Sequence, residues 1–324
     1  MYTGWVLKFK HGTHVLPHER DVQLRQGTRY RSSDNFASLI RLNSTFLEII
    51  DRRFRQRGML GTGFSVVGAV GVMYWWFMYS SGSLVPNANG ERMWGSFAFE
   101  AIAFGGTLLW LWRFVLGKEF FTHTHYPIRF NRKTRMVHAY RDKRDGGIVS
   151  VPWDKAFFHI GQAVGDDTEF LRDIRCHVVD EHDKILDTFA VGHYFDDERK
   201  IRSVFEFIRR YMEDGPENVF EDPSAKAAKI ADDLVVPLRR IDLSVTPSLR
   251  NCFNWVVAAM PERWFEARYV LMPLYAPLFL CRWLVFKTCR SPRWPARIEA
   301  ESVIEPNDPY RLEEPTVHVQ WGDV

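Results

Sequence analysis

The chain has few cysteines, and none of them stands in a pattern that is typical of a zinc site or of a disulfide framework. Its 324 residues include four cysteines without a Cys-x-x-Cys pair, so reduced thiols are expected. They are Cys176, Cys252, Cys281 and Cys289. Basic and acidic residues are also nearly equal in number, 43 against 40. The formal net charge is +3, which creates no overall field that would attract nucleic acid.

Sequence motifs of catalysis and of nucleotide binding are absent as well. The chain has no Gly-x-Ser-x-Gly, His-Glu-x-x-His, P-loop or Rossmann glycine pattern. The first residues lack the continuous apolar core of a signal peptide, which predicts an N-terminus that stays in the cytoplasm. We therefore expect a protein that binds rather than catalyses, without a cofactor or a metal ion.

What the chain does contain is two long apolar segments. Residues 58–90 carry no charged side chain, and residues 58–79 are long enough as a helix to cross a hydrocarbon core of about 30 Å. A second apolar segment, at about residues 93–113, holds a single charge in its interior, Glu100. Polar and turn-forming residues separate the two segments, so they predict a transmembrane helical hairpin, residues 58–116 in all.

The charges that flank the hairpin predict its orientation. Arginines precede the first span and basic residues follow the second, whereas the loop between them offers only Glu91 and Arg92. Basic flanks stay on the cytoplasmic side of a membrane. We expect a multi-pass membrane protein with both termini in the cytoplasm. The flanking residues are Arg52, Arg53, Arg55, Arg57, Arg113 and Lys118.

Two features of the hairpin suggest specific roles. An acidic residue within a span, such as Glu100, marks a functional site by default; the alternative is a structural carboxyl bonded to a tyrosine or serine hydroxyl of the other helix. Small residues spaced four apart, Ser65 with Ala69 and Ala101 with Gly105, predict that the two helices approach closely.

The segment before the hairpin, residues 43–57, has the spacing of an amphipathic helix. Phe46, Ile49 and Ile50 recur at helical intervals, and Thr45 with Glu48 matches a capping box. We expect a juxtamembrane helix that lies on the anionic inner leaflet, at the end of a cytoplasmic region formed by residues 1–57.

After the hairpin the apolar pattern changes to that of strands. Residues 128–139 predict a β-hairpin around a polar turn at 131–134, and Pro152 predicts an edge strand or a bend. Two further strands flank a turn at 180–184. An amphipathic helix follows, begun by Asp196 or Asp197 and ended by Gly215 and Pro216; its apolar stripe is Ile201, Phe205, Ile208 and Met212.

Short antiparallel strands followed by one helix are typical of a pleckstrin-homology-like (PH-like) domain, expected over residues 117–215. The predicted fold class is an α+β membrane protein with a two-helix transmembrane hairpin and this cytoplasmic domain. Residues 216–298 form a helical region, and residues 299–324 an acidic, extended tail. Within the helical region, residues 269–286 are apolar but interrupted by prolines; we expect them to lie on or dock beside the membrane, with a third crossing as the alternative.

Two spans, then "PIRFNRKTRMVHAYR" and "VPWDKAFFHI", then a helix, resemble an uncharacterised family of bacterial inner-membrane proteins that are often encoded beside type VI secretion effectors. The resemblance covers residues 43–215. It implies an immunity or accessory protein of a secreted toxin, with a protein as its partner, and it brings no catalytic residues with it.

The favoured function is thus a membrane-anchored protein-binding module. One alternative is a scaffold that senses anionic lipid through a basic turn, and another is an enzyme or transporter built around Glu100 and the histidines. The basic residues expected to contact lipid or a partner are Arg129, Arg132, Lys133 and Arg135. The nearby His123 and His125 share a face of an extended segment, but no third ligand stands at a recognisable spacing, so we expect no metal there.

Overall fold

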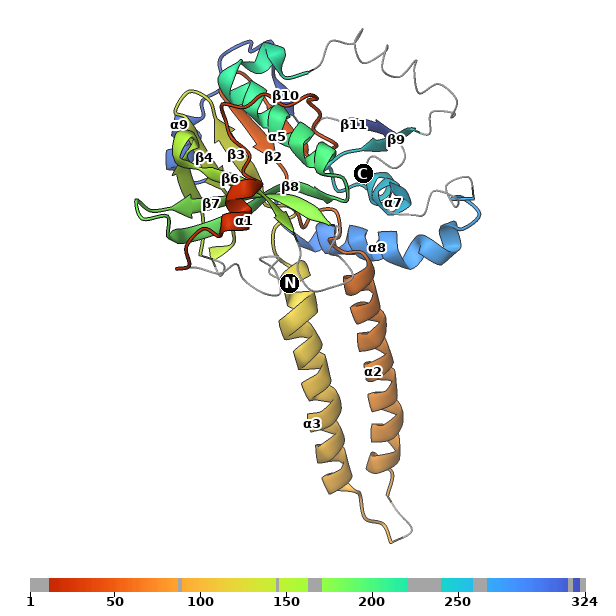
Figure 1. Ribbon diagram of the computed structural model, residues 1–324. Coiled ribbons are helices and arrows are strands. Elements are labelled where there is room, and N and C mark those ends of the chain that lie inside the picture. Colours follow the sequence, from red (N-terminus) through yellow and green to blue (C-terminus); the bar gives the residue numbers. More distant parts are fainter. Residues whose placement is uncertain are drawn as a thin grey trace. The chain divides into compact units, whose positions relative to one another are not determined.

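The computed structural model describes residues 12–86, 89–143, 146–162, 171–220, 240–258, 267–313 and 317–320. The protein is a mixed α and β chain with antiparallel sheets and two long apolar helices, as expected. It divides into two units (Figure 1). The β unit comprises residues 1–55, 125–246 and 292–324, and the helical unit comprises residues 56–124 and 247–291.

The larger sheet of the β unit joins strands from three distant parts of the chain. Its strand order is β10-β1-β2-β3-β4-β5, and each neighbouring pair is antiparallel. The strands are β1 (Leu39–Leu42), β2 (Phe46–Ile49), β3 (Ile128–Asn131), β4 (Met136–Ala139), β5 (Val149–Pro152) and β10 (Leu312–Glu313). Because β2 pairs with β3, two strands on either side of the apolar hairpin in the sequence are neighbours in the sheet.

The predicted juxtamembrane helix over residues 43–57 is wrong, because this segment holds strand β2. All four residues of β2 are buried, including Glu48, so neither face of the strand is solvated and the alternation that marks a half-buried strand is missing. The Asn43 side chain accepts hydrogen bonds from the amides of Thr45 and Phe46 at 2.9 and 2.8 Å. That local bonding favours a tight turn between β1 and β2 rather than a helix.

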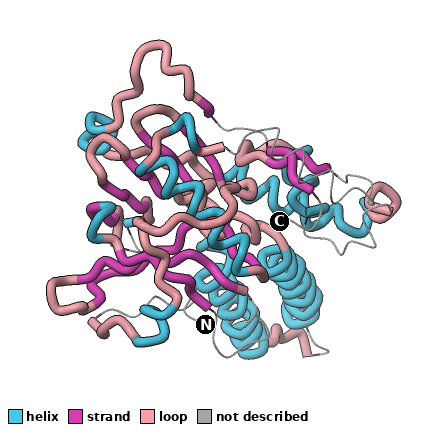
Figure 2. The backbone as a smooth tube through the Cα atoms, turned by 45° about the horizontal axis from the view of Figure 1, so that its top comes forward, coloured by secondary structure: helices cyan, strands magenta, loops and turns pink. Residues whose placement is uncertain are grey.

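The strands and the helix predicted after the hairpin are confirmed. Phe130 pairs with Val137 across β3 and β4, and Pro152 lies in β5, at an edge of the sheet. A second, three-stranded sheet contains β6 (Phe157–Gln162), β7 (Arg172–Val179) and β8 (Ile185–Phe195). The strands appear in magenta in Figure 2. Helix α5 (Glu198–Glu213) begins after Asp197, whose side chain accepts a hydrogen bond from the Arg199 amide.

The core of the β unit is shared by both sheets and α5. The predicted apolar stripe of α5 is buried. Phe205 of this helix contacts the rings of Trp153 and Phe158, with centroid separations of 6.1 and 5.4 Å. The β unit therefore extends beyond residues 117–215: it needs β1 and β2 before the hairpin and β10 near the C-terminus.

The helical unit contains α2 (Leu60–Leu84), α3 (Trp94–Leu111), α7 (Leu249–Ala258) and α8 (Met272–Thr288). Helix α8 crosses the end of the hairpin at which α2 begins (Figure 1). Gly58 permits this contact: its φ is +69°, and an added Cβ would lie 2.7 Å from the Cα of Arg282. Segment 269–286 is thus docked within the helical unit, and α8 has 17 residues.

Helices α2 and α3 contact each other, but four glycines of the hairpin do not lie at that contact. A Cβ added at Gly68, Gly71, Gly105 or Gly106 would meet no atom within 4 Å. Ser65 instead donates a hydrogen bond to the Gly61 carbonyl oxygen of its own helix.

A buried ion pair fixes the central strand pair of the larger sheet. Arg129 of β3 is fully buried and directly opposite Glu48 of β2; a guanidinium nitrogen and Oε1 of Glu48 are 2.8 Å apart. The indole of Trp294 donates to the same oxygen at 2.7 Å. The guanidinium also lies over the rings of Phe46 and Trp294, 4.1 and 4.8 Å from their centroids. These contacts compensate most of the charge that burial would otherwise penalise, although Nη1 of Arg129 is buried without a hydrogen-bond partner among the described residues.

We expect Arg129→Met to lower the free energy of unfolding by about 3–5 kcal/mol, because the buried Glu48 carboxylate loses its hydrogen-bonded cation and keeps only the partly exposed Arg41, 3.8 Å away. Glu48→Gln combined with Arg129→Met leaves no buried charge and is expected to recover part of this loss. Lys133→Met, which removes an exposed partner of Glu305, is the matched control and should cost less than about 1 kcal/mol. Denaturant titration of the full chain, followed by tryptophan fluorescence, measures all three; equal costs for both single variants would contradict the account.

Candidate functional site

Glu100, the acid within the second apolar segment, is bonded to serines. It is buried near the loop end of the hairpin, and its Oε1 accepts hydrogen bonds from Ser83 at 2.6 Å and Ser96 at 3.0 Å. Ser80 donates to the other oxygen at 3.4 Å. Ser80 and Ser83 belong to α2, so these bonds link the two helices. The geometry matches the structural alternative for Glu100, a carboxyl held by hydroxyl groups.

The basic turn between β3 and β4 is neutralised by acidic side chains of the β unit. Arg135 makes a two-point contact with Asp154 and also bonds Glu213 at 3.0 Å. Lys133 pairs with Glu305 at 2.5 Å. These contacts leave little uncompensated positive charge for a lipid surface.

The other two basic residues of the prediction occupy different environments. Arg129 is fully buried in its pair with Glu48, so its predicted contact with lipid or a partner is wrong. The sequence shows that this residue is charged, but it does not show that β2 pairs with β3 and buries the side chain. Arg132 is half-buried, and its amide donates to the Thr45 carbonyl oxygen at 3.0 Å.

The acidic C-terminal segment packs on its own β unit where the structure describes it. Helix α9 (Ala296–Glu301) brings Glu299 within 3.3 Å of Arg129. Asp308 accepts hydrogen bonds from the amide and the hydroxyl of Ser44 at 2.7 and 2.6 Å. Strand β11 (Val317–Gln320) pairs with β9 (Arg240–Leu243). The described parts of the predicted extended tail are thus ordered pieces of the β unit.

The histidines of the 122–142 stretch do not gather into a site among the described residues. His123 forms a backbone bridge with Arg290 in the helical unit, whereas His125 belongs to the β unit. His138 of β4 is buried, and its Nδ1 lies 2.8 Å from the Ser150 hydroxyl.

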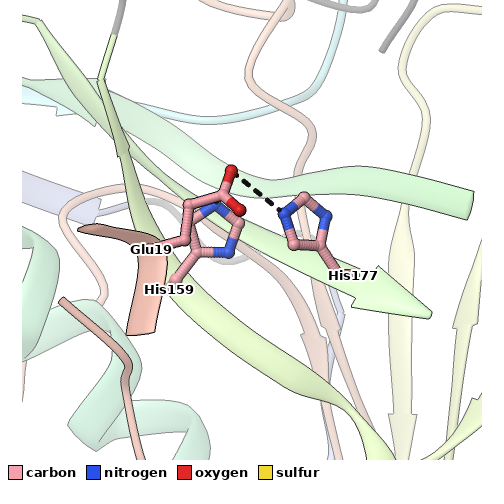
Figure 3. Close-up of side chains that lie close together, drawn as sticks. All are labelled: Glu19, His159 and His177. Atoms are coloured by element: carbon pink, nitrogen blue, oxygen red, sulfur yellow. Dashed lines mark ion pairs between the residues drawn. The ribbon is translucent and has the colours of Figure 1, made fainter. Parts of the chain in front are cut away.

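A different group of side chains, Glu19, His159 and His177, does come together (Figure 3). One ligand atom from each lies within 4.8 Å of the other two. His159 of β6 and His177 of β7 share one face of the three-stranded sheet, and their ring centroids are 4.3 Å apart. Glu19 reaches them from the short helix α1 (Pro17–Asp21), with its Oε1 3.4 Å from Nε2 of His177 and 3.9 Å from Nε2 of His159.

The surroundings set the charge of this cluster. Both imidazoles are almost fully buried, and Glu19 is half-buried. Burial, together with the neighbouring His177, lowers the pKa of His159 far below its usual value, so the ring is neutral at pH 7. Burial alone would raise the pKa of Glu19, but the imidazoles and the Leu16 amide outweigh it and hold the pKa below its usual value. The cluster therefore combines a carboxylate with a neutral His159 imidazole.

Sequence reasoning missed this cluster because its members are far apart along the chain. The predicted strands containing "FFHIG" and "RCHVV" each carry a histidine. Only the register, which places Phe157 opposite His177, puts both rings on one face. Nothing in the sequence pattern links them to Glu19, which α1 supplies from the N-terminal region.

The fold and these sites define a mixed α+β protein with a surface-exposed apolar helical hairpin. The chain belongs to the family of unknown function DUF6708, whose model matches residues 107–306. The match contains both histidines of the cluster and leaves Glu19 outside. No match was found among curated proteins or among solved structures.

The buried His138 predicts a measurable acid sensitivity. Burial first, and then the charges of Arg129 and Arg297, lower its pKa to about 4, although Glu301 acts in the opposite direction. Between this value and the ordinary one near 6.5, the unfolded chain binds a proton that the folded chain refuses, so folding stability falls as pH drops. We expect His138 to contribute about 1–2 kcal/mol to the stability lost between pH 7 and pH 5.

The variant His138→Gln removes this contribution, so its stability should depend less steeply on pH than that of the natural chain. Thermal unfolding across this pH interval measures the difference. His182→Gln, on an exposed turn, is the control and is expected to follow the natural chain. Equal pH slopes for the natural chain and His138→Gln would contradict the assignment.

Proposed function

We propose that the chain is a membrane-anchored module that binds a protein, and that it serves as an immunity or accessory protein of a secreted toxin rather than as an enzyme. The apolar hairpin carries this proposal. Its two helices pass the length and hydropathy criteria for a span, yet only 11% and 6% of their apolar windows are buried. A core helix of a soluble domain would be mostly buried, so a bilayer is the environment that suits this surface.

The position of the hairpin in the chain supports one orientation. Strand β2 leads into the hairpin and β3 leads out of it, and these strands are hydrogen-bonded neighbours. The segments before and after the hairpin both contribute to the β unit and therefore belong on one side of the membrane. With the basic flanks, this arrangement favours the cytoplasmic side of a bacterial inner membrane for both termini.

We further infer that the β unit is a PH-like domain. Strands β2 to β5 form a meander, β6 to β8 form a second antiparallel sheet, and α5 follows and packs on the shared core. This order supports a PH-like fold with the hairpin inserted between β2 and β3. Such folds bind many kinds of ligand, so the ligand has to be inferred from the side chains of the site and not from the fold.

The choice of a protein over a lipid headgroup follows from the basic turn. Arg129 is buried and paired, and Arg135 and Lys133 are engaged by acids of the same unit. A lipid-sensing scaffold would need these charges free, so the geometry supports it less. The secretion context follows from the sequence resemblance, and the DUF6708 match is compatible with it.

An aspartate in the middle of each helix tests the anchor separately from binding. Val70→Asp combined with Ile102→Asp places two exposed acids at mid-span, each costing about 2.5–3.5 kcal/mol in a bilayer. We expect this variant to leave the membrane fraction and to stop protecting cells from the co-encoded toxin. It should still retain the toxin on an affinity resin in detergent, because the β unit is unchanged.

Leu186→Asp, at an exposed apolar position of β8, is the matched control and should remain in the membrane fraction. Membrane fractionation after alkaline washing, a survival assay and pull-down give the three readouts. If the hairpin variant stays in the membrane, the anchor is wrong. If the natural chain neither retains the toxin nor protects cells, the immunity function is wrong.

A further inference from the structure

The cluster of Glu19, His159 and His177 has the ligand atoms of a transition-metal site. Two imidazole nitrogens and one carboxylate oxygen are the set that zinc accepts, whereas calcium and magnesium prefer oxygen ligands throughout. The cluster is separate from the membrane hairpin, since all three residues belong to the β unit.

The spacing of these atoms fits tetrahedral coordination. With metal–ligand bonds of about 2.0–2.1 Å, the edge of a tetrahedron around zinc is about 3.3 Å. Oε1 of Glu19 lies 3.4 Å from Nε2 of His177 and 3.9 Å from Nε2 of His159. One edge is therefore already close to this value, and the second needs a change of about half an ångström. The third edge, between the two imidazole nitrogens, lies within the 4.8 Å that bounds the cluster, and side-chain rotation would have to close it.

Neighbouring groups orient two of the three ligands. Nδ1 of His177 lies 2.7 Å from the Thr188 hydroxyl oxygen. When the Nδ1–H group donates a hydrogen bond to this oxygen, the lone pair of the imidazole is on Nε2. Oε2 of Glu19 accepts a hydrogen bond from the Leu16 amide at 2.8 Å, which leaves Oε1 toward the imidazoles. These contacts resemble the outer-shell bonds that fix metal ligands.

The strongest sign of a missing partner is Nε2 of His177. His177 is more than nine-tenths buried, and its Nε2 makes no well-formed hydrogen bond among the described residues, because its ion-pair partner Oε1 of Glu19 lies 3.4 Å away (Figure 3). A buried polar nitrogen without a partner costs free energy, so such a group calls for a ligand. A cation between the two imidazoles and the carboxylate would satisfy this nitrogen and the carboxylate together.

We propose that Glu19, His159 and His177 bind one Zn²⁺ ion, with a fourth coordination position taken by water or by an exogenous ligand. The ion joins α1 to β6 and β7, and so fastens the N-terminal region to the second sheet. Entry is possible beside Glu19, the one ligand whose side chain is partly exposed, at 16%. Tetrahedral geometry and mixed nitrogen and oxygen donors favour zinc over copper, which prefers square-planar sites.

Zinc titration of the chelator-treated full chain tests the site. Calorimetry and metal analysis should give one Zn²⁺ per chain, and zinc should raise the thermal unfolding temperature, because it binds only the folded state. Glu19→Gln should weaken zinc binding more than about 100-fold and abolish the shift. Thr188→Val, which removes an orienting contact, should weaken it about 10- to 100-fold.

Two controls keep this test decisive. His182→Gln changes an exposed histidine on the turn between β7 and β8 and should bind zinc as the natural chain does. Glu19 is partly exposed, so Glu19→Gln should fold without metal, and circular dichroism of the metal-free chains checks this.

Cobalt substitution reports the geometry. Co²⁺ in this site should give the intense visible absorption of tetrahedral coordination, and Glu19→Gln should lose it. If the natural chain binds no more zinc than Glu19→Gln, or if cobalt shows only the weak octahedral spectrum, the proposed site is wrong.

Discussion

The pairing of β2 with β3 is the constraint on which the rest of the structure depends. These strands lie on opposite sides of the apolar hairpin in the sequence, and they meet through a four-residue register and the buried pair of Glu48 and Arg129. Since neither charge could stay buried alone, the register of the two strands is fixed by electrostatics as well as by apolar contacts. The hairpin thus becomes an insertion between two neighbouring strands of one sheet.

The same ion pair organises the C-terminal part of the β unit. Trp294 donates to Glu48, Glu299 contacts Arg129, and Glu305 and Asp308 bond Lys133 and Ser44. The acidic segment and the basic turn therefore compensate each other within the unit. Lys133 and Arg135 are paired with acids and Arg129 is buried, and these contacts favour recognition of a protein over lipid sensing in the proposed function.

The sequence predicted the elements whose pattern is local. The two apolar helices follow from uninterrupted hydrophobic length, and β3, β4 and α5 follow from clear periods of two and 3.6 residues. The segment at 43–57 was mistaken for a helix because the spacing of Phe46, Ile49 and Ile50 also suits a helix, and a strand buried on both faces shows no alternation. The cluster of Glu19, His159 and His177 depends on strand register and on a contact between distant segments, neither of which a single sequence reveals.

The insertion of the hairpin between paired strands can be measured directly. Leu47 and Phe130 are cross-strand partners, so cysteines at both positions should form a disulfide in a chain whose four native cysteines are replaced by alanine. Cleavage at a protease site introduced into the loop between α2 and α3 should then leave the two fragments linked on a non-reducing gel. Cysteines at Leu47 and at Ser150, which lies on β5, should not link them. Separate fragments from the first pair, or equal linkage by the second, would contradict the account.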